Sequence, residues 1–101
     1  MRVMIFFDLP VGTAAERKEY SRFRKFLIRN GFLMMQESIY TKIVLTPADA
    51  AAAVRKVRLA SPSERLVQAL TLTEKQFAGM ELIVGSTEKQ TIDSTERLVV
   101  L

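Results

Sequence analysis

Two helical segments with clear start and stop signals interrupt a series of short apolar runs. The first segment begins at Thr13, because Thr13-Ala14-Ala15-Glu16 is a capping box in which the threonine hydroxyl can bond the first-turn amides and the glutamate carboxylate reaches back to the start of the helix. It ends at Asn30-Gly31, where glycine permits the left-handed conformation that stops a helix. The second begins at Thr46-Pro47 and runs to about Leu59. These signals divide the apolar runs into separate strands.

The apolar runs around the helices have the composition of β-strands. Residues 2–8 are aromatic and β-branched, which is typical of a buried strand. Residues 32–46 are too long for one ordinary strand, so we predict two strands with a turn or bulge near Gln36–Ser38. The remaining predictions are strands at 64–73, Met80–Gly85 and Arg97–Leu101, the last after a polar linker at Ser86–Thr95.

The predicted order is β-α-β-β-α-β with an additional C-terminal strand. This is the ferredoxin-like arrangement, an α+β fold with an antiparallel sheet and two helices on one face. We expect a single ferredoxin-like domain over residues 1–85, followed by a polar linker and strand at 86–101. A chain of 101 residues can bury a modest core without disulfides.

The composition limits the compartment. The chain has no cysteine, which gives no sign of an oxidising environment. No run approaches the ~20 apolar residues of a membrane span, and the N-terminus lacks the pattern of a secretory signal. The sequence therefore predicts a cytoplasmic protein with no membrane partner.

The composition also limits the chemistry. There is no histidine and no cysteine, so imidazole bases, thiolate nucleophiles and soft-metal sites are excluded. A catalytic reaction would need carboxylates, hydroxyls, lysines or a hard metal ion bound by oxygen. Asp8, at the end of the first predicted strand, is the best candidate for such a metal and for catalysis.

Two interpretations of Asp8 remain open from the pattern alone. In the first, its carboxylate begins an Asx-type turn or bonds the loop amides before Pro10. In the second, it binds Mg²⁺ or another hard divalent cation, which usually takes one or two carboxylates with water and phosphate oxygens. A two-fold homodimer would supply a second Asp8, and a metal-bound water could then attack a phosphodiester.

The excess positive charge lies on the first helix. The net charge of the chain is +4, and the segment Thr13–Asn30 carries all of it, with six basic and two acidic residues. At 100° per residue, a basic stripe forms on the side opposite the apolar residues. Solvated helix faces usually mix charges of both signs, so the stripe favours nucleic-acid binding over a merely solvated face. Its members are Lys18, Arg22, Lys25 and Arg29.

Several motifs together resemble one family, CRISPR-associated protein 2. They are a strand that ends in Phe6-Phe7-Asp8-Leu9-Pro10, the basic helix, and Gln36-Glu37-Ser38-Ile39-Tyr40. The stretch Leu72–Phe77, followed by Met80 and Ile83-Val84-Gly85, is similar to members from type II systems. The resemblance covers essentially residues 1–85.

This resemblance implies a homodimer in which two Asp8 carboxylates face each other and hold Mg²⁺. It also implies a subunit of spacer acquisition that bridges dimers of the integrase, CRISPR-associated protein 1, and binds double-stranded DNA or RNA. Arg17 falls near a basic position of the family. The chain departs from the family at two positions. Phe7 stands where many members have Tyr, and Met34 stands where some members have Arg. These departures favour the scaffold role over endonuclease activity.

Two alternatives to the spacer-acquisition role remain. One is a stand-alone, toxin-like endoribonuclease of the same fold, which would require Asp8 and Mg²⁺. The other is a small-molecule regulatory or binding domain, against which the one-sided charge of the helix argues. Whether the protein is an enzyme is left open by the sequence.

Overall fold

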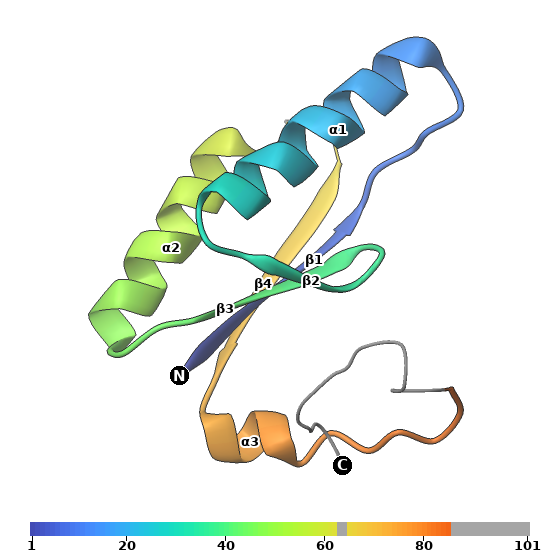
Figure 1. Ribbon diagram of the computed structural model, residues 1–101. Coiled ribbons are helices and arrows are strands. Elements are labelled where there is room, and N and C mark those ends of the chain that lie inside the picture. Colours follow the sequence, from blue (N-terminus) through green and yellow to red (C-terminus); the bar gives the residue numbers. More distant parts are fainter. Residues whose placement is uncertain (63–64, 86–101) are drawn as a thin grey trace. The chain divides into compact units, whose positions relative to one another are not determined.

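The computed structural model describes residues 1–62 and 65–85, and the chain divides into two compact units, Met1–Thr71 and Leu72–Leu101. The first unit contains the sheet and both long helices, in the predicted β-α-β-β-α-β order (Figure 1). The elements are β1 (Arg2–Asp8), α1 (Ala14–Arg29), β2 (Leu33–Gln36), β3 (Ile39–Ile43), α2 (Pro47–Ala60) and β4 (Leu66–Leu72), of which β4 ends on the first residue of the second unit.

The four strands form one sheet in the order β2-β3-β1-β4. β3 pairs antiparallel with both β1 and β2, and Ile5 lies opposite Tyr40 in the first of these pairs. The β2–β3 pairing is irregular between Met34 and Gln36, near the predicted turn. Figure 1 shows α1 and α2 on the same side of this sheet. The α+β class, the antiparallel sheet and the placement of the helices are confirmed.

The helix boundaries follow the capping signals in the sequence. The Thr13 hydroxyl accepts from the Glu16 amide at 3.1 Å, and the Glu16 carboxylate accepts from the Thr13 amide at 3.0 Å, so the capping box is complete. Gly31 has φ of 89°, the left-handed conformation expected after the end of α1. Thr46 caps α2 by accepting from the Asp49 amide at 3.0 Å.

Alternate residues of β1 build the core. Val3, Ile5 and Phe7 belong to the buried cluster, in line with the two-residue period of a strand, and Met4, which points to the other face, is buried as well. α1 contributes the fully buried Phe23 and Leu27. The apolar face predicted for the first helix is therefore confirmed. The other core members are Leu9, Phe32, Tyr40, Val44, Ala50, Ala53 and Val57.

The sheet face opposite the helices carries exposed apolar side chains, and we call it the open face. Ile43 lies on this face because it pairs with Arg2, which alternates with core residues of β1. On β4, Val67 packs against the core, so Leu66 and Leu70 point the other way. The exposed fractions are 74% for Leu33, 62% for Ile43, 56% for Leu66 and 51% for Leu70.

The second unit differs from the prediction in two ways. A short helix, α3 (Glu74–Ala78), is present, and Thr73 and Gln76 form a capping box at its start. The prediction of a strand at Met80–Gly85 is wrong, because residues 80–85 do not form a strand. An apolar run forms a strand only when it hydrogen-bonds a neighbour. The predicted linker and strand at 86–101, and with them the boundary at 85, lie at or beyond the limit of the described residues.

Candidate metal and nucleic-acid sites

Asp8 is the last residue of β1 and is exposed. By the alternation of the strand it points to the open face, because Phe7 before it points into the core. Within residues 1–62 and 65–85, its carboxylate makes no hydrogen bond to a loop amide, so the Asx-turn interpretation has no support there. The exposed carboxylate is accessible to solvent.

One chain does not supply a complete metal site. No group of three or more Asp, Glu, His or Cys side chains that could hold a metal occurs in the described part of the chain. Mg²⁺ is usually bound through one or two carboxylates together with water and phosphate oxygens. A single Asp8 therefore fits this ion only in combination with a second carboxylate or a bound phosphate.

Arg17 shapes the loop that follows Asp8. Its Nη1 donates to the carbonyl oxygens of Val11, at 3.2 Å, and Gly12, at 3.4 Å. The Gly12 amide in turn donates to the Glu16 carboxylate at 3.0 Å. The Arg17 guanidinium stays exposed. It therefore combines a structural role in the loop with a position from which it can still contact an anion.

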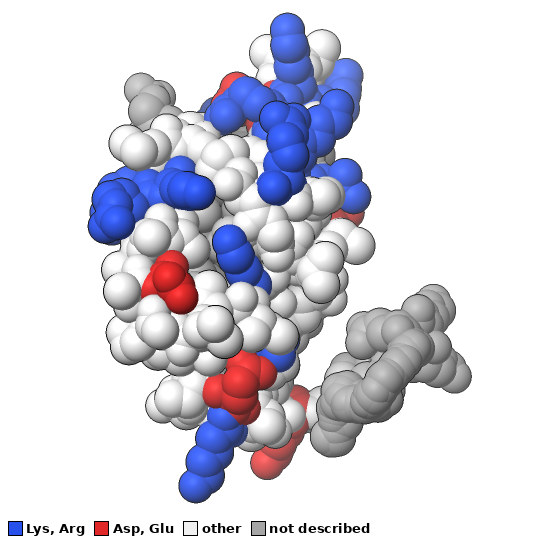
Figure 2. Space-filling model, turned by 60° about the vertical axis from the view of Figure 1, so that its left-hand side comes forward, with Lys and Arg blue, Asp and Glu red and all other residues white. Residues whose placement is uncertain are grey.

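The basic stripe is where the sequence predicts it. Lys18, Lys25 and Arg29 are exposed on α1, away from the buried Phe23 and Leu27. Figure 2 looks toward the side that bears the helices and shows Lys and Arg side chains over much of its upper part. α2 adds three more exposed cations to the helical side of the first unit, namely Arg55, Lys56 and Arg58.

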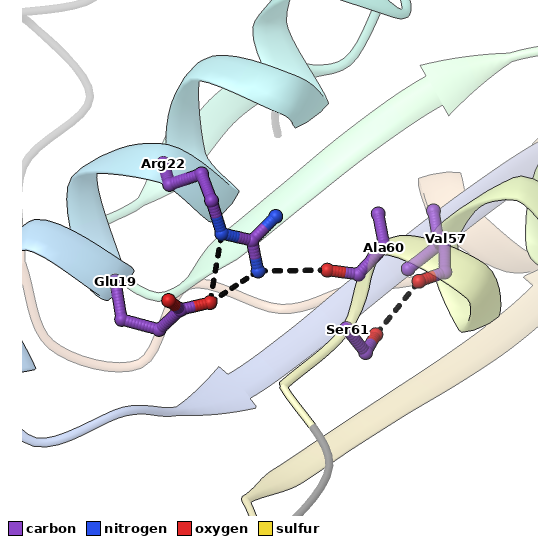
Figure 3. Close-up of polar contacts among 5 residues, drawn as sticks. All are labelled: Glu19, Arg22, Val57, Ala60 and Ser61. Atoms are coloured by element: carbon purple, nitrogen blue, oxygen red, sulfur yellow. Dashed lines mark hydrogen bonds and ion pairs between the residues drawn. The ribbon is translucent and has the colours of Figure 1, made fainter.

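Arg22, the fourth member of the stripe, is engaged in the fold. Its Nε donates to the Glu19 carboxylate at 2.8 Å, and its Nη2 donates to the same carboxylate and to the carbonyl oxygen of Ala60 at 2.9 Å (Figure 3). Near this end of α2, the Ser61 hydroxyl donates to the carbonyl oxygen of Val57 at 2.7 Å. The hydrogen bond from Arg22 lowers the pKa of Glu19. Arg22 thus joins α1 to the C-terminal end of α2.

A hydrogen bond for which the sequence carries no signal lies near the end of β1. The Tyr20 hydroxyl donates to the carbonyl oxygen of Glu37 at 3.1 Å, which connects α1 to the β2–β3 turn. The sequence assigns Tyr20 to the core face of the helix but carries no signal for its hydroxyl. The position of this turn beside the end of β1 follows from the register of the sheet, which the sequence alone does not give.

The family-model comparison matches residues 1–80 to the family described as CRISPR associated protein Cas2. A relative from Treponema denticola is 48% identical over 101 residues and covers 100% of both chains. One from Ligilactobacillus salivarius is 44% identical over 101 residues, again covering 100% of both chains. Both relatives are named CRISPR-associated endoribonuclease Cas2. The chain belongs to the Cas2 family, and this supports a CRISPR-associated role.

The fold agrees with this assignment. A crystal structure of Cas2 from Streptococcus pyogenes, determined at pH 6.5, matches with a TM-score of 0.63 and 20% identity, over 83% of this chain and 100% of that one. At this identity the likeness concerns the fold alone. No helix among the described residues has the length and apolar character needed to cross a membrane.

Proposed function

We propose that the protein is a homodimeric nucleic-acid-binding subunit of CRISPR spacer acquisition that bridges dimers of the integrase Cas1. Membership of the Cas2 family supports the CRISPR-associated part of this role. The observation that carries the nucleic-acid part is the basic stripe, in which the exposed cations of α1 stand opposite its buried face. Such a surface recognises phosphates and duplex shape rather than base sequence.

The open face supports the homodimer. Several large apolar side chains are exposed on this sheet face, and exposed apolar surface favours burial against a partner. A second copy is the natural occupant because a two-fold axis pairs the same surface with itself. Asp8 points to the same face, so a face-to-face dimer would bring two Asp8 carboxylates toward each other.

The dimer would also complete a Mg²⁺ site. Two facing carboxylates repel each other, and a divalent cation between them removes that repulsion. Asp8 would hold the metal, and Mg²⁺ when bound would supply an activated water and neutralise charge on a phosphodiester. Arg17, at the loop after Asp8, would contact a nearby phosphate.

Complex formation with the integrase tests the scaffold role. The purified protein is mixed with Cas1 from the same locus and with duplex DNA, and the mass of the product is measured by size-exclusion chromatography with light scattering. A stable complex of both proteins and DNA is expected. A variant with Lys18, Lys25 and Arg29 all changed to alanine should retain the Cas1 contact and bind DNA more weakly. Absence of any ternary complex with the unaltered protein would reject the scaffold role.

A second candidate activity is Mg²⁺-dependent endoribonuclease activity. The observation that favours it is that both relatives, which align with the full length of this chain, are named CRISPR-associated endoribonucleases. Cleavage of single-stranded RNA should require Mg²⁺ and disappear in Asp8→Asn, with EDTA as the control. Growth arrest on expression would favour a stand-alone, toxin-like role over the scaffold role. RNA cleavage that persists in Asp8→Asn would exclude Asp8 as the metal ligand.

A further inference from the structure

The end of β1 is held by a turn of the sheet and by a tyrosine from α1. The Phe7 amide, directly before Asp8, donates to the carbonyl oxygen of Ser38 at 3.1 Å. The Tyr20 hydroxyl donates to the carbonyl oxygen of Glu37 at 3.1 Å. Because the two acceptors are consecutive residues, the same turn is bound to the end of β1 by one hydrogen bond and to α1 by the other.

Aromatic packing fixes the donor side of this arrangement. The Phe7 ring lies 5.8 Å from the Tyr20 ring and 5.2 Å from the Phe23 ring, the latter edge-on. Phe7 is buried in the core, whereas Tyr20 is only half-buried and reaches the turn at the surface. Packing against the buried Phe7 ring therefore helps to hold the Tyr20 ring where its hydroxyl reaches the turn.

The turn itself contains little that would fix its geometry. Only Glu37 and Ser38 separate β2 from β3, and tight hairpins of this length usually rely on Gly, Asn or Asp. The pairing of Phe6 with Ile39 places the turn beside Asp8. Contacts from outside can therefore contribute to holding the turn, and the hydrogen bond from the Tyr20 hydroxyl is such a contact.

We propose that Tyr20 is a positioning residue for Asp8, acting through the Glu37–Ser38 turn. Without the hydroxyl, the Glu37 carbonyl loses its partner and the turn gains freedom. The Phe7–Ser38 hydrogen bond then opens more often, and the backbone at Asp8 becomes less well placed. The metal-binding consequence rests on the proposed role of Asp8, whereas the backbone consequence can be measured without any metal.

Tyr20→Phe tests this proposal, with Tyr40→Phe as the matched control. Both substitutions remove only a hydroxyl, but the buried Tyr40 hydroxyl has no hydrogen-bond partner among the described residues, so its removal breaks no hydrogen bond. Amide hydrogen exchange of Phe7 should accelerate about fivefold in Tyr20→Phe, as expected for one net hydrogen bond, and stay unchanged in Tyr40→Phe. Mn²⁺ affinity, measured by titration calorimetry, should fall by a similar factor only in Tyr20→Phe.

The two measurements separate the proposal from the metal role of Asp8. Unchanged Phe7 exchange in Tyr20→Phe would overturn the proposal, and so would equal changes in the two variants. If the unaltered protein binds no Mn²⁺, or if Asp8→Asn binds it equally well, the metal role fails. The exchange rate of Phe7 still decides whether Tyr20 holds the strand end.

Discussion

Arg22 donates a hydrogen bond from Nη2 to the carbonyl oxygen of Ala60, 2.9 Å away, and so links α1 to the end of α2. The same guanidinium is paired with Glu19. Carbonyl oxygens at a helix C-terminus lack partners within the helix, and a cation from another element satisfies one of them here. Arg22 thus differs from the other cations of the basic stripe, because it also contributes to the stability of the fold.

Arg22→Ala should therefore reduce both stability and nucleic-acid affinity. Loss of an exposed, charge-assisted hydrogen bond between helices is expected to lower the free energy of unfolding by about 1 kcal/mol. Urea denaturation monitored by circular dichroism measures this change. Arg29→Ala is the control, because Arg29 belongs to the same stripe and should weaken nucleic-acid binding with only a few tenths of a kcal/mol lost in stability. Equal stability losses in the two variants would contradict the structural role of Arg22.

The Glu19–Arg22 pair should give a small pH dependence of stability. The hydrogen bond from Arg22 lowers the pKa of Glu19 from its ordinary value of 4.5. A carboxyl whose pKa is lower in the folded state stabilises the fold above its unfolded pKa, and this stabilisation is lost as the pH falls through the folded pKa. The difference in melting temperature between the unaltered protein and Glu19→Gln should therefore be largest at about pH 7 and shrink as the pH falls below the ordinary pKa and through the lowered one. A difference that grows on acidification would have the wrong sign.

Adjacent residues at the end of α1 test the core assignment. Leu27 is fully buried, whereas Ile28 is 46% exposed. Leu27→Ala should lower the free energy of unfolding by about 2–5 kcal/mol, because it removes apolar contacts and leaves a cavity. Ile28→Ala should lower it by much less, about 1 kcal/mol or under. Guanidinium denaturation of both variants makes the comparison, and similar losses would show that the helix faces are wrongly assigned.

The proposed homodimer predicts how a substitution on the open face changes the oligomeric state. Leu70→Glu places a charge on this face and should produce monomers, because a buried unpaired carboxylate in the interface is costly. Leu59→Glu is the control, since Leu59 is 83% exposed on α2 and lies on the helical side. Sedimentation velocity measures the masses of both variants. Dimers that survive Leu70→Glu and dissociate in Leu59→Glu would place the interface on the helices.

The elements with strong local signals could be predicted from the sequence. Thr13 with Glu16 marks the start of α1, Gly31 follows its end, and Thr46 marks the start of α2. These signals act within a few residues, so the chain carries them wherever it folds. The start of α3 at Thr73 has the same signal, but a five-residue helix has too little periodicity to be recognised.

The features that could not be predicted depend on neighbours distant in the sequence. Residues 80–85 have the composition of a strand, but composition does not supply a pairing partner. The Tyr20–Glu37 hydrogen bond spans 17 positions and depends on the strand register. The periodicity of the helix correctly places Arg22 on the exposed face of α1. Its hydrogen bond to Ala60 spans 38 positions and could not be predicted, because it depends on the packing of two helices.

The salt dependence of duplex DNA binding tests the central claim, that the basic stripe contacts phosphates. Affinity is measured by fluorescence anisotropy over a range of salt concentrations. The logarithm of affinity should fall linearly with the logarithm of salt, with a slope of about 0.9 for each phosphate contacted. Changing Lys18 and Lys25 together to alanine should reduce that slope by about 2 for each protomer that contacts DNA. A nearly flat slope for the unaltered protein, or an equal slope in the double variant, would contradict the account.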